Sequence, residues 1–232
     1  MVADVLGKVL FDMKTIVIFG DSLTWGYDPA NELLPPGGKL HRFSDAQRWP
    51  GVLASELGDE YQVIVEGLCG RTTVWDDPTE PCRCGTEQLI PVLDSQAPFD
   101  LVIILLGTND LKGYFSARAR DIARGAGILV DQAIHHCVDD FNGPAKVLLV
   151  APPALGERID QTASDFAFTG ALAKSKDFAK QYHVIAYKWG AYFFDAASVT
   201  TASDIDQVHL DVDQHARLGR ALAPLVREIL ST

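Results

Sequence analysis

Short apolar runs alternate along this chain with segments in which apolar residues recur every three or four positions. The runs are rich in β-branched, aliphatic or aromatic residues and predict strands at 14–19, 61–65, 101–106, 146–150 and 191–194. The run at 101–106 contains no polar residue, which is typical of a parallel strand buried on both faces.

Helical spacing predicts helices between these strands, at about 48–57, 86–93 and 116–137, over roughly 20 residues before Gly190, and from Asp211 to the C-terminus. The last helix has Asp211 as a predicted N-cap and Gln214 three residues later, which is a capping-box pattern. Alternating strands and helices predict an α/β fold, a doubly wound parallel sheet with helices on both faces. Two long loops are expected at 24–47 and 70–84, and loops of this length are usually functional.

Composition predicts a compact acidic protein. The 232 residues include no linker-like segment, so we expect a single domain at 14–232 after an N-terminal extension at 1–13. The net charge of −11 argues against nucleic acid or an anionic membrane as a partner, because binding phosphate requires clustered Lys and Arg. No apolar stretch approaches the roughly 20 residues of a membrane span. The N-terminus has no basic region of the kind that begins a signal peptide, which predicts a cytoplasmic location.

The cysteines predict neither a disulfide framework nor a metal site. Cys82 and Cys84 are separated by one residue, which gives a strained disulfide ring and poor metal spacing, so they are expected to be free thiols together with Cys69 and Cys137. His135 and His136 precede Cys137, but adjacent residues on a helix point about 100° apart. We therefore expect no metal and no cofactor.

Candidate chemistry lies at the end of the first strand and near the last helix. Ser22 follows the run at 14–19, and Gly20 lets the backbone turn sharply toward a ligand there. Asp206 and His209 are three residues apart, close enough for the carboxylate to fix one tautomer of the imidazole. These are the parts of a serine nucleophile, its base and an orienting acid. Alternatively, Ser22 caps a helix, Asp206 orders a turn, and Asp204 replaces it beside His209.

Four separated blocks extend this pattern. They are Gly20-Asp21-Ser22-Leu23, the segment Glu66-Gly67-Leu68-Cys69-Gly70-Arg71, Gly107-Thr108-Asn109-Asp110, and Asp206-Gln207-Val208-His209. In this order they resemble the GDSL, or SGNH, hydrolase family, from about residue 14 to the C-terminus. The resemblance implies a flavodoxin-like three-layer α/β/α sandwich with a five-stranded parallel sheet. Thr24-Trp25-Gly26, Arg71-Thr72-Thr73 and Asp76-Asp77-Pro78-Thr79 further resemble the bacterial arylesterase, acyltransferase and perhydrolase branch.

The resemblance also implies roles for individual residues. Ser22, Asp206 and His209 would form the catalytic triad. The backbone N–H groups of Ser22 and Gly70 and the side-chain amide of Asn109 would form the oxyanion hole. The alternatives are purely structural: Gly70 allows a turn, and Asn109 caps the next helix. Three aromatic residues on the long loops are candidates for an acyl or aryl pocket, or for core positions: Trp25, Tyr27 and Trp75.

The sequence thus predicts a serine esterase that acts on small aryl or alkyl acetate-like esters through an acyl-enzyme, with acyl transfer or perhydrolysis as a further activity. One alternative is a carbohydrate O-deacetylase, which the same catalytic parts would serve. An alternative of another class is a catalytically silent flavodoxin-like binding module. The expected partner is a small-molecule ester, and homo-oligomerisation is left open.

Overall fold

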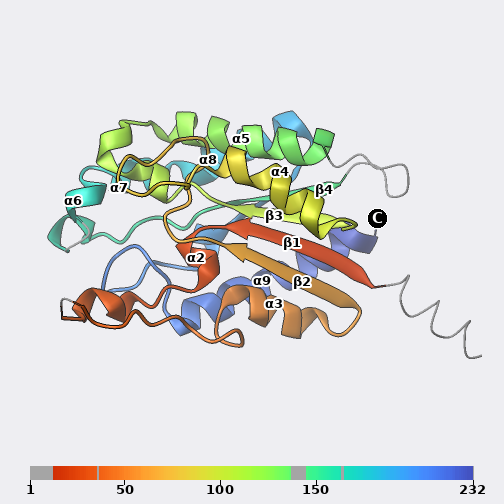
Figure 1. The fold of residues 1–232 in the computed structure, drawn as a ribbon, viewed down its shortest axis with the longest axis horizontal. Coiled ribbons are helices and arrows are strands. Elements are labelled where there is room, and N and C mark those ends of the chain that lie inside the picture. The colour runs from red at the N-terminus through yellow and green to blue at the C-terminus, as the bar shows by residue number, and fades with distance from the viewer. Residues whose placement is uncertain (1–12, 36, 137–144, 163–164, 232) are drawn as a thin grey trace, which may run out of the picture.

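A five-stranded parallel sheet forms the centre of the protein. The computed structural model describes residues 13–35, 37–136, 145–162 and 165–231. The strands are β1 (Lys14–Gly20), β2 (Tyr61–Gly67), β3 (Leu101–Leu105), β4 (Lys146–Ala151) and β5 (Tyr192–Asp195), in the order β2-β1-β3-β4-β5 (Figure 1). This is the flavodoxin-like strand order, so the predicted fold class is confirmed.

Helices cover both faces of the sheet (Figure 1). On one face lie α4 (Gly85–Gln96), α5 (Ala119–His136) and α8 (Phe178–Trp189), and on the other lie α3 (Trp49–Leu57) and α9 (Val212–Ser231). Successive residues of a strand point to opposite faces. Accordingly, Val17 packs in the core under α5 and α8, whereas Ile16 packs in the core under α3 and α9.

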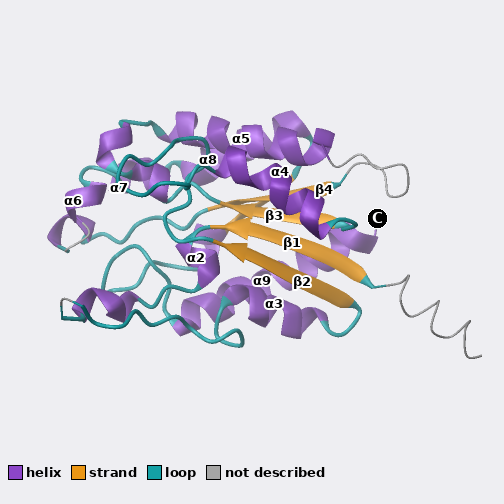
Figure 2. Cartoon of the chain, viewed as in Figure 1, coloured by secondary structure: helices purple, strands orange, loops and turns teal. Residues whose placement is uncertain are grey.

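The topology places a ligand site between β1 and β3. β1 is followed in the sequence by β2, which pairs with it on one side, and then by β3, which pairs with it on the other side. The connections that leave the carboxyl ends of β1 and β3 therefore run in opposite directions across the sheet. Ligands of open α/β sheets bind at this switch point. Figure 2 shows the loops gathered at the carboxyl ends of the strands. Ser22 follows β1 and Asn109 follows β3, so both lie at this edge.

The predicted helix of roughly 20 residues before Gly190 is wrong. These residues form two helices, α7 (Leu172–Lys176) and α8, which are separated at Asp177. A third and shorter helix, α6 (Asp165–Phe168), precedes them. Gly170 has a φ of +70°, a left-handed conformation that cannot continue a right-handed helix, so α6 and α7 are separate. Four short 3₁₀ helices also lie in the predicted loops after the strands: η2 (Asn109–Leu111), η3 (Gly113–Phe115), η4 (Ile159–Gln161) and η5 (Ala196–Ser198).

The loop expected at 24–47 is also partly helical. Ser22 is the first residue of the short helix α2 (Ser22–Trp25), and η1 (Pro29–Leu33) follows it. The N-cap of α2 is Asp21, whose Oδ1 accepts the N–H of Leu23 at 2.9 Å, so Ser22 is not the helix cap. The chain leaves α2 through Gly26, which has a φ of +90°.

As predicted, α9 begins directly after Asp211, whose carbonyl accepts the N–H of His215 at 3.0 Å, but the predicted capping box is wrong. Gln214 Oε1 accepts the N–H of Thr201 at 3.1 Å, and Asp211 Oδ1 accepts the hydroxyl of Ser203 at 2.8 Å. Both side chains thus tie the segment before α9 to the helix, a use that the local pattern does not reveal. Residues 1–12 of the predicted extension and Cys137 lie outside the described residues. Within the described ranges, no helix has the length and apolar character needed to cross a membrane.

Candidate active site

Ser22, His209 and Asp206 form one chain of hydrogen bonds. His209 Nε2 lies 2.9 Å from Ser22 Oγ, and His209 Nδ1 lies 2.6 Å from Asp206 Oδ2. Because a carboxylate can only accept, Nδ1 carries the proton and Nε2 is left to accept the hydroxyl proton of Ser22. The fold brings Ser22 to a partner 187 positions later in the chain. This is the arrangement of an activated serine nucleophile.

Asp206 is held as a carboxylate. Its Oδ1 accepts the backbone N–H groups of Val208 and His209, each at 2.9 Å. Burial by itself would raise the pKa of Asp206, but the hydrogen bond and charge of His209 and these two N–H groups together hold it below the ordinary value. Asp204, the alternative orienting acid, instead pairs with Arg158 at 2.7 Å, and its side chain is 92% exposed.

Each of the three residues expected in the oxyanion hole offers an N–H donor. Ser22 begins α2, so its N–H belongs to the unsatisfied first turn of a helix. Gly70 has a φ of +80°, which favours glycine, and no hydrogen bond within the described protein uses the N–H of either residue. The amide of Asn109 is oriented by a bond from its Nδ2 to the carbonyl of Arg71 at 3.1 Å. These groups can donate to an oxygen that gains negative charge.

The segment that follows Gly70 is fixed to the sheet by two charged residues. The guanidinium of Arg71 donates to the carbonyl of Gly20 at 2.8 Å and lies 4.0 Å from the centre of the Phe19 ring. Asp110 accepts the N–H of Thr73 at 2.9 Å and also its hydroxyl. Burial raises the pKa of Asp110 to about 6, although the bonds from Thr73 lower it. Asp110 therefore orders a loop.

Asp21 is the second buried acid beside the site. It caps α2 through Oδ1, while its Oδ2 has no hydrogen-bond partner in the described part of the chain. Burial raises its pKa to about 7, against the lowering effects of the Leu23 N–H and of the His209 charge. Asp21 is fully buried and directly precedes Ser22. Its side chain therefore holds the first turn of α2, where the nucleophile lies, and has no contact with solvent.

Sequence reasoning missed a buried ion pair that holds the long loop at 70–84. Lys112 Nζ lies 2.8 Å from Asp77 Oδ2, and the hydroxyl of Tyr114 donates to the same oxygen at 2.7 Å. Burial would raise the pKa of Asp77, but the bonds from Lys112, Thr79 and Tyr114 hold it well below its usual range. The only local signal was that Lys112 follows the Asn109 block and Asp77 follows the Gly70 block.

The structure brings one of the three predicted pocket aromatics to the triad. The ring of Tyr27 lies 4.3 Å from the imidazole of His209, and its hydroxyl donates to Glu32 at 3.1 Å. Trp25 instead contacts Arg42, whose guanidinium carbon lies over the Trp25 ring, 4.6 Å from the ring centre. Trp75 packs 6.1 Å from Phe115 at the edge of the core.

A hollow of about 270 Å³ adjoins the triad at Asp206. We call it the Asp206 hollow. Besides Asp206, it is lined by Glu32, Leu33, Arg158, Gln161, Thr162, Asp204 and Ile205. Two larger hollows, of about 690 and 430 Å³, have no residue of the triad in their lining. Of these three hollows, the smallest is thus the one that has a triad residue, Asp206, in its lining, but Ser22 and His209 do not line it.

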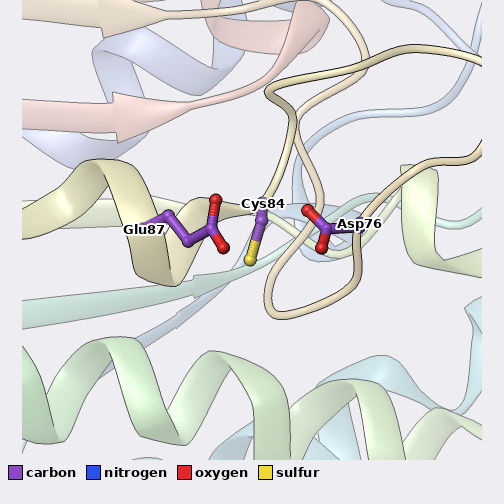
Figure 3. Close-up of side chains that lie close together, drawn as sticks. All are labelled: Asp76, Cys84 and Glu87. Carbon is purple, nitrogen blue, oxygen red and sulfur yellow. The ribbon is translucent and has the colours of Figure 1, made fainter.

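Three potential metal ligands also converge at the start of α4. Figure 3 shows Asp76, Cys84 and Glu87 pointing toward one another, with their ligand atoms all within 4.8 Å. Cys84 Sγ contacts Thr86 Oγ1 at 3.1 Å, and both carboxylates are exposed. Three donors fall one short of a closed structural zinc site, so we assign no metal here. Cys84, Cys69 and Cys82 are free thiols, as expected.

Comparisons with known proteins agree with this geometry. The model of the GDSL-like Lipase/Acylhydrolase family matches residues 18–217. A search of curated proteins gave no match. A solved structure of an aryl esterase from M. smegmatis is 40% identical, with a TM-score of 0.84 over 94% of this chain and 100% of that one. A carbohydrate acetylesterase from Sinorhizobium meliloti is 38% identical, with a TM-score of 0.86 over 93% of this chain and 99% of that one. From the family match over most of its length, and from relatives this similar over nearly the whole of both chains, it follows that this chain belongs to the GDSL-like lipase/acylhydrolase family.

Proposed function

We propose that this protein hydrolyses small carboxylic esters, of the aryl or alkyl acetate type, through an acyl-enzyme on Ser22. The observation that carries the assignment of residues is the bond chain from Ser22 Oγ to His209 Nε2, at 2.9 Å, and from His209 Nδ1 to Asp206, at 2.6 Å. Membership of an acylhydrolase family makes the protein an ester hydrolase. Family membership therefore argues against the alternative that this protein is a catalytically silent binding module.

The reaction follows from the positions of the groups. Ser22 Oγ attacks the ester carbonyl carbon as its proton passes to His209 Nε2, and the carbonyl oxygen becomes an oxyanion. The N–H groups of Ser22 and Gly70 and the Asn109 amide donate to that oxygen. His209 then returns the proton to the departing alcohol, which leaves the acyl group on Ser22. Water, deprotonated by His209, attacks the acyl-enzyme and releases the acid and free Ser22.

Two substrate types are supported by the relatives. The likeness to the M. smegmatis aryl esterase favours aryl esters, and the likeness to the S. meliloti carbohydrate acetylesterase favours O-acetylated sugars. The identities, 40% and 38%, are too similar to separate them. The polar lining of the Asp206 hollow is the observation that keeps the carbohydrate O-deacetylase as a second candidate.

Acyl transfer is part of the proposal, because His209 can deprotonate an alcohol or a peroxide as it deprotonates water. The Tyr27 ring beside His209 gives the site an apolar wall that favours less polar acceptors. In aqueous vinyl acetate with benzyl alcohol, we expect benzyl acetate early in the reaction, before its slower hydrolysis. Chromatograms that show only acetate at all times, from fully active enzyme, would mark the protein as a plain hydrolase.

Hydrolysis of p-nitrophenyl acetate tests the central proposal. Wild-type protein should hydrolyse this ester, and Ser22→Ala should reduce kcat by about 10⁴ or more, as loss of a triad nucleophile does. Ser95→Ala, at an exposed serine of α4, is the matched control and should keep wild-type activity. Turnover that survives in Ser22→Ala would show that another group is the nucleophile.

A further inference from the structure

Two of the three oxyanion donors are supplied by separate segments of the chain. Gly70 lies in the segment that follows β2, and Asn109 lies after β3. Since β1 separates β2 from β3 in the sheet, the strands themselves do not bond these two segments to each other. The donors of an oxyanion hole must be fixed at hydrogen-bond distance from the same oxygen before the reaction begins. Contacts between the two segments must therefore set the distance between Gly70 and Asn109.

Lys112 is fixed to the Asn109 segment through its backbone. Asn109 begins η2, and the N–H of Lys112 donates to the carbonyl of Asn109 at 3.2 Å, which closes this turn. The side chain of Lys112 then reaches the loop at 70–84. There Nζ lies 2.8 Å from Asp77 Oδ2 and 3.6 Å from Glu80 Oε1. Lys112 thus contacts two carboxylates of the Gly70 loop from a position one turn after Asn109.

Glu80 connects this ion pair to Gly70. A Cβ at Gly70 would lie 2.5 Å from Glu80 Oε2, so the carboxylate packs directly against the α-carbon of Gly70. Asp77 helps to place Glu80 there, because its Oδ1 accepts the N–H groups of Thr79, at 2.8 Å, and of Glu80, at 3.3 Å. Lys112 is thereby connected to Gly70 through these two acids.

A second contact between the segments holds a different part of the loop. Asn109 Nδ2 donates to the carbonyl of Arg71 at 3.1 Å, directly after Gly70. Lys112 instead acts on residues 77–80, where the loop folds back against Gly70. A bond at one point leaves a segment free to rotate about it, whereas supports at two points fix its orientation. The ion pair of Lys112 is therefore suited to fix the direction of the Gly70 N–H.

The groups of this ion pair are buried and charged. The side chain of Asp77 is fully buried, and that of Lys112 is 10% exposed. Burial would lower the pKa of Lys112, but its bond to Asp77 and the charge of Glu80 raise it. The pKa of Asp77 is held below its usual range, although burial alone would raise it. Without the ammonium group, the carboxylates of Asp77 and Glu80 would repel each other, and Glu80 would move relative to Gly70.

We propose that Lys112 is a positioning residue of the oxyanion hole, which holds Gly70 at the distance from Asn109 that a single oxyanion requires. The inference rests on the proposed function and adds a residue to its site. Lys112 acts on the reaction through Asp77 and Glu80. Displacement of Gly70 would weaken a hydrogen bond that is strongest in the transition state, so it should slow the reaction with little effect on binding of the uncharged ester.

Kinetics of Lys112→Met with p-nitrophenyl acetate test the proposal. Met keeps the length of the apolar stem but cannot bind carboxylates. Both kcat and kcat/KM should fall about 10- to 100-fold, which is part of the 10²–10³ that loss of a whole donor costs. Lys14→Met is the matched control, because it removes an ion pair of similar length, 2.9 Å to Asp100, at the amino end of β1. It should keep both constants within about three-fold of wild type.

Inhibition by the ketone trifluoroacetone separates positioning from a loss of folded protein. Ser22 Oγ adds to the carbonyl carbon, the hydroxyl proton passes to His209, and the carbonyl oxygen becomes an oxyanion like that of the transition state. In Lys112→Met, Ki should rise by the same factor by which kcat/KM falls, whereas Lys14→Met should keep the wild-type Ki. A partly unfolded variant would lose kcat but keep Ki, because only folded molecules bind the inhibitor.

Tyr114→Phe keeps the test decisive even where Lys112→Met does not fold. It removes one hydrogen bond to Asp77, of 2.7 Å, from a residue that is 47% exposed. It should lower kcat/KM and raise Ki by about 2- to 5-fold.

The outcomes separate this inference from the proposed function. If wild-type protein does not hydrolyse p-nitrophenyl acetate, the proposed function fails and the role of Lys112 fails with it. If wild-type protein hydrolyses the ester, an unchanged Ki in the folded variants at Lys112 and Tyr114 overturns the role of Lys112 alone, whatever happens to kcat. A rise of Ki in Lys14→Met equal to that in Lys112→Met overturns it as well.

Discussion

At the scale of single residues, the choice between Asp206 and Asp204 decides how His209 is oriented. Asp206 is buried and bonds both the ring and the backbone of His209, whereas Asp204 is exposed and pairs with Arg158. Asp206→Asn should leave the fold intact and lower kcat for p-nitrophenyl acetate by about 10⁴, because the amide stabilises the wrong tautomer. Asp204→Asn is the control and should keep kcat within about five-fold. Equal losses in both variants would contradict the assignment.

Some residues of the site could be predicted from the sequence, and others could not. Ser22, Asn109 and His209 were predicted because each lies in a short block after a strand or before a helix. The Lys112–Asp77 pair was not predicted, because its partners are 35 positions apart and neither has a local pattern that requires the other. Likewise, nothing in the spacing of Trp25 and Tyr27 shows that only Tyr27 reaches His209.

At the scale of elements, Asp21, the N-cap of α2, makes the free energy of unfolding depend on pH. Its folded pKa of about 7 is raised above the 3.8 expected in the unfolded chain, so the folded state binds the proton more tightly. The resulting stabilisation is complete below pH 3.8 and is lost as the pH rises through 7. Between pH 5 and 8, Asp21 should remove on the order of 2–3 kcal/mol from the free energy of unfolding.

Urea unfolding at pH 5 and pH 8 measures this effect. Asp21→Asn should show a smaller loss of stability between the two pH values than wild-type protein, while Asp110, with a pKa raised to about 6, leaves part of the dependence in place. Asp213→Asn, at an exposed carboxylate in the first turn of α9, should retain the wild-type dependence. An Asp21→Asn profile parallel to that of wild type would disprove the buried, protonated state.

The packing of α5 against the loop at 70–84 gives a second prediction at this scale. A Cβ at Gly125 would lie 2.3 Å from Thr73 Oγ1, and Thr73 is the residue that Asp110 holds. Gly125→Ala gains about 1 kcal/mol in helix propensity but overpacks this contact, so we expect a net loss of about 1–2 kcal/mol and a lower kcat. At Gly113 the nearest atom would be 3.7 Å away, so Gly113→Ala should be tolerated. Equal stability of the two variants would contradict close packing at Gly125.

The elements themselves were predicted to different degrees. The five strands were found because buried parallel strands are continuous apolar runs, and each observed strand lies within two residues of the expected range. The segment before Gly190 was predicted as one helix, but α7 ends and α8 begins at Asp177. Asp177 itself has helical backbone angles, so no local sequence pattern marks the break. The first turn at Ser22 was missed because four helical residues are too few to show a periodicity.

At the scale of the whole molecule, the strand order brings four distant segments to one edge of the sheet. Alternation of strands and helices predicted a parallel sheet, but the order β2-β1-β3-β4-β5 was implied only by the family resemblance, since periodicity does not specify which strands are neighbours. Ser22, Gly70, Asn109 and His209 converge because the carboxyl ends of parallel strands meet there. The site is thus a consequence of the topology.

Labelling with an organophosphate tests the central claim most directly. Diisopropyl fluorophosphate reacts with a serine that a neighbouring base has activated, so one equivalent should add to wild-type protein and abolish its esterase activity. Peptide mass mapping should place the phosphoryl group on Ser22, and Ser22→Ala should take up none. An adduct on any other residue, or active protein that takes up no reagent, would contradict the claim that Ser22, activated by His209, is the nucleophile of this enzyme.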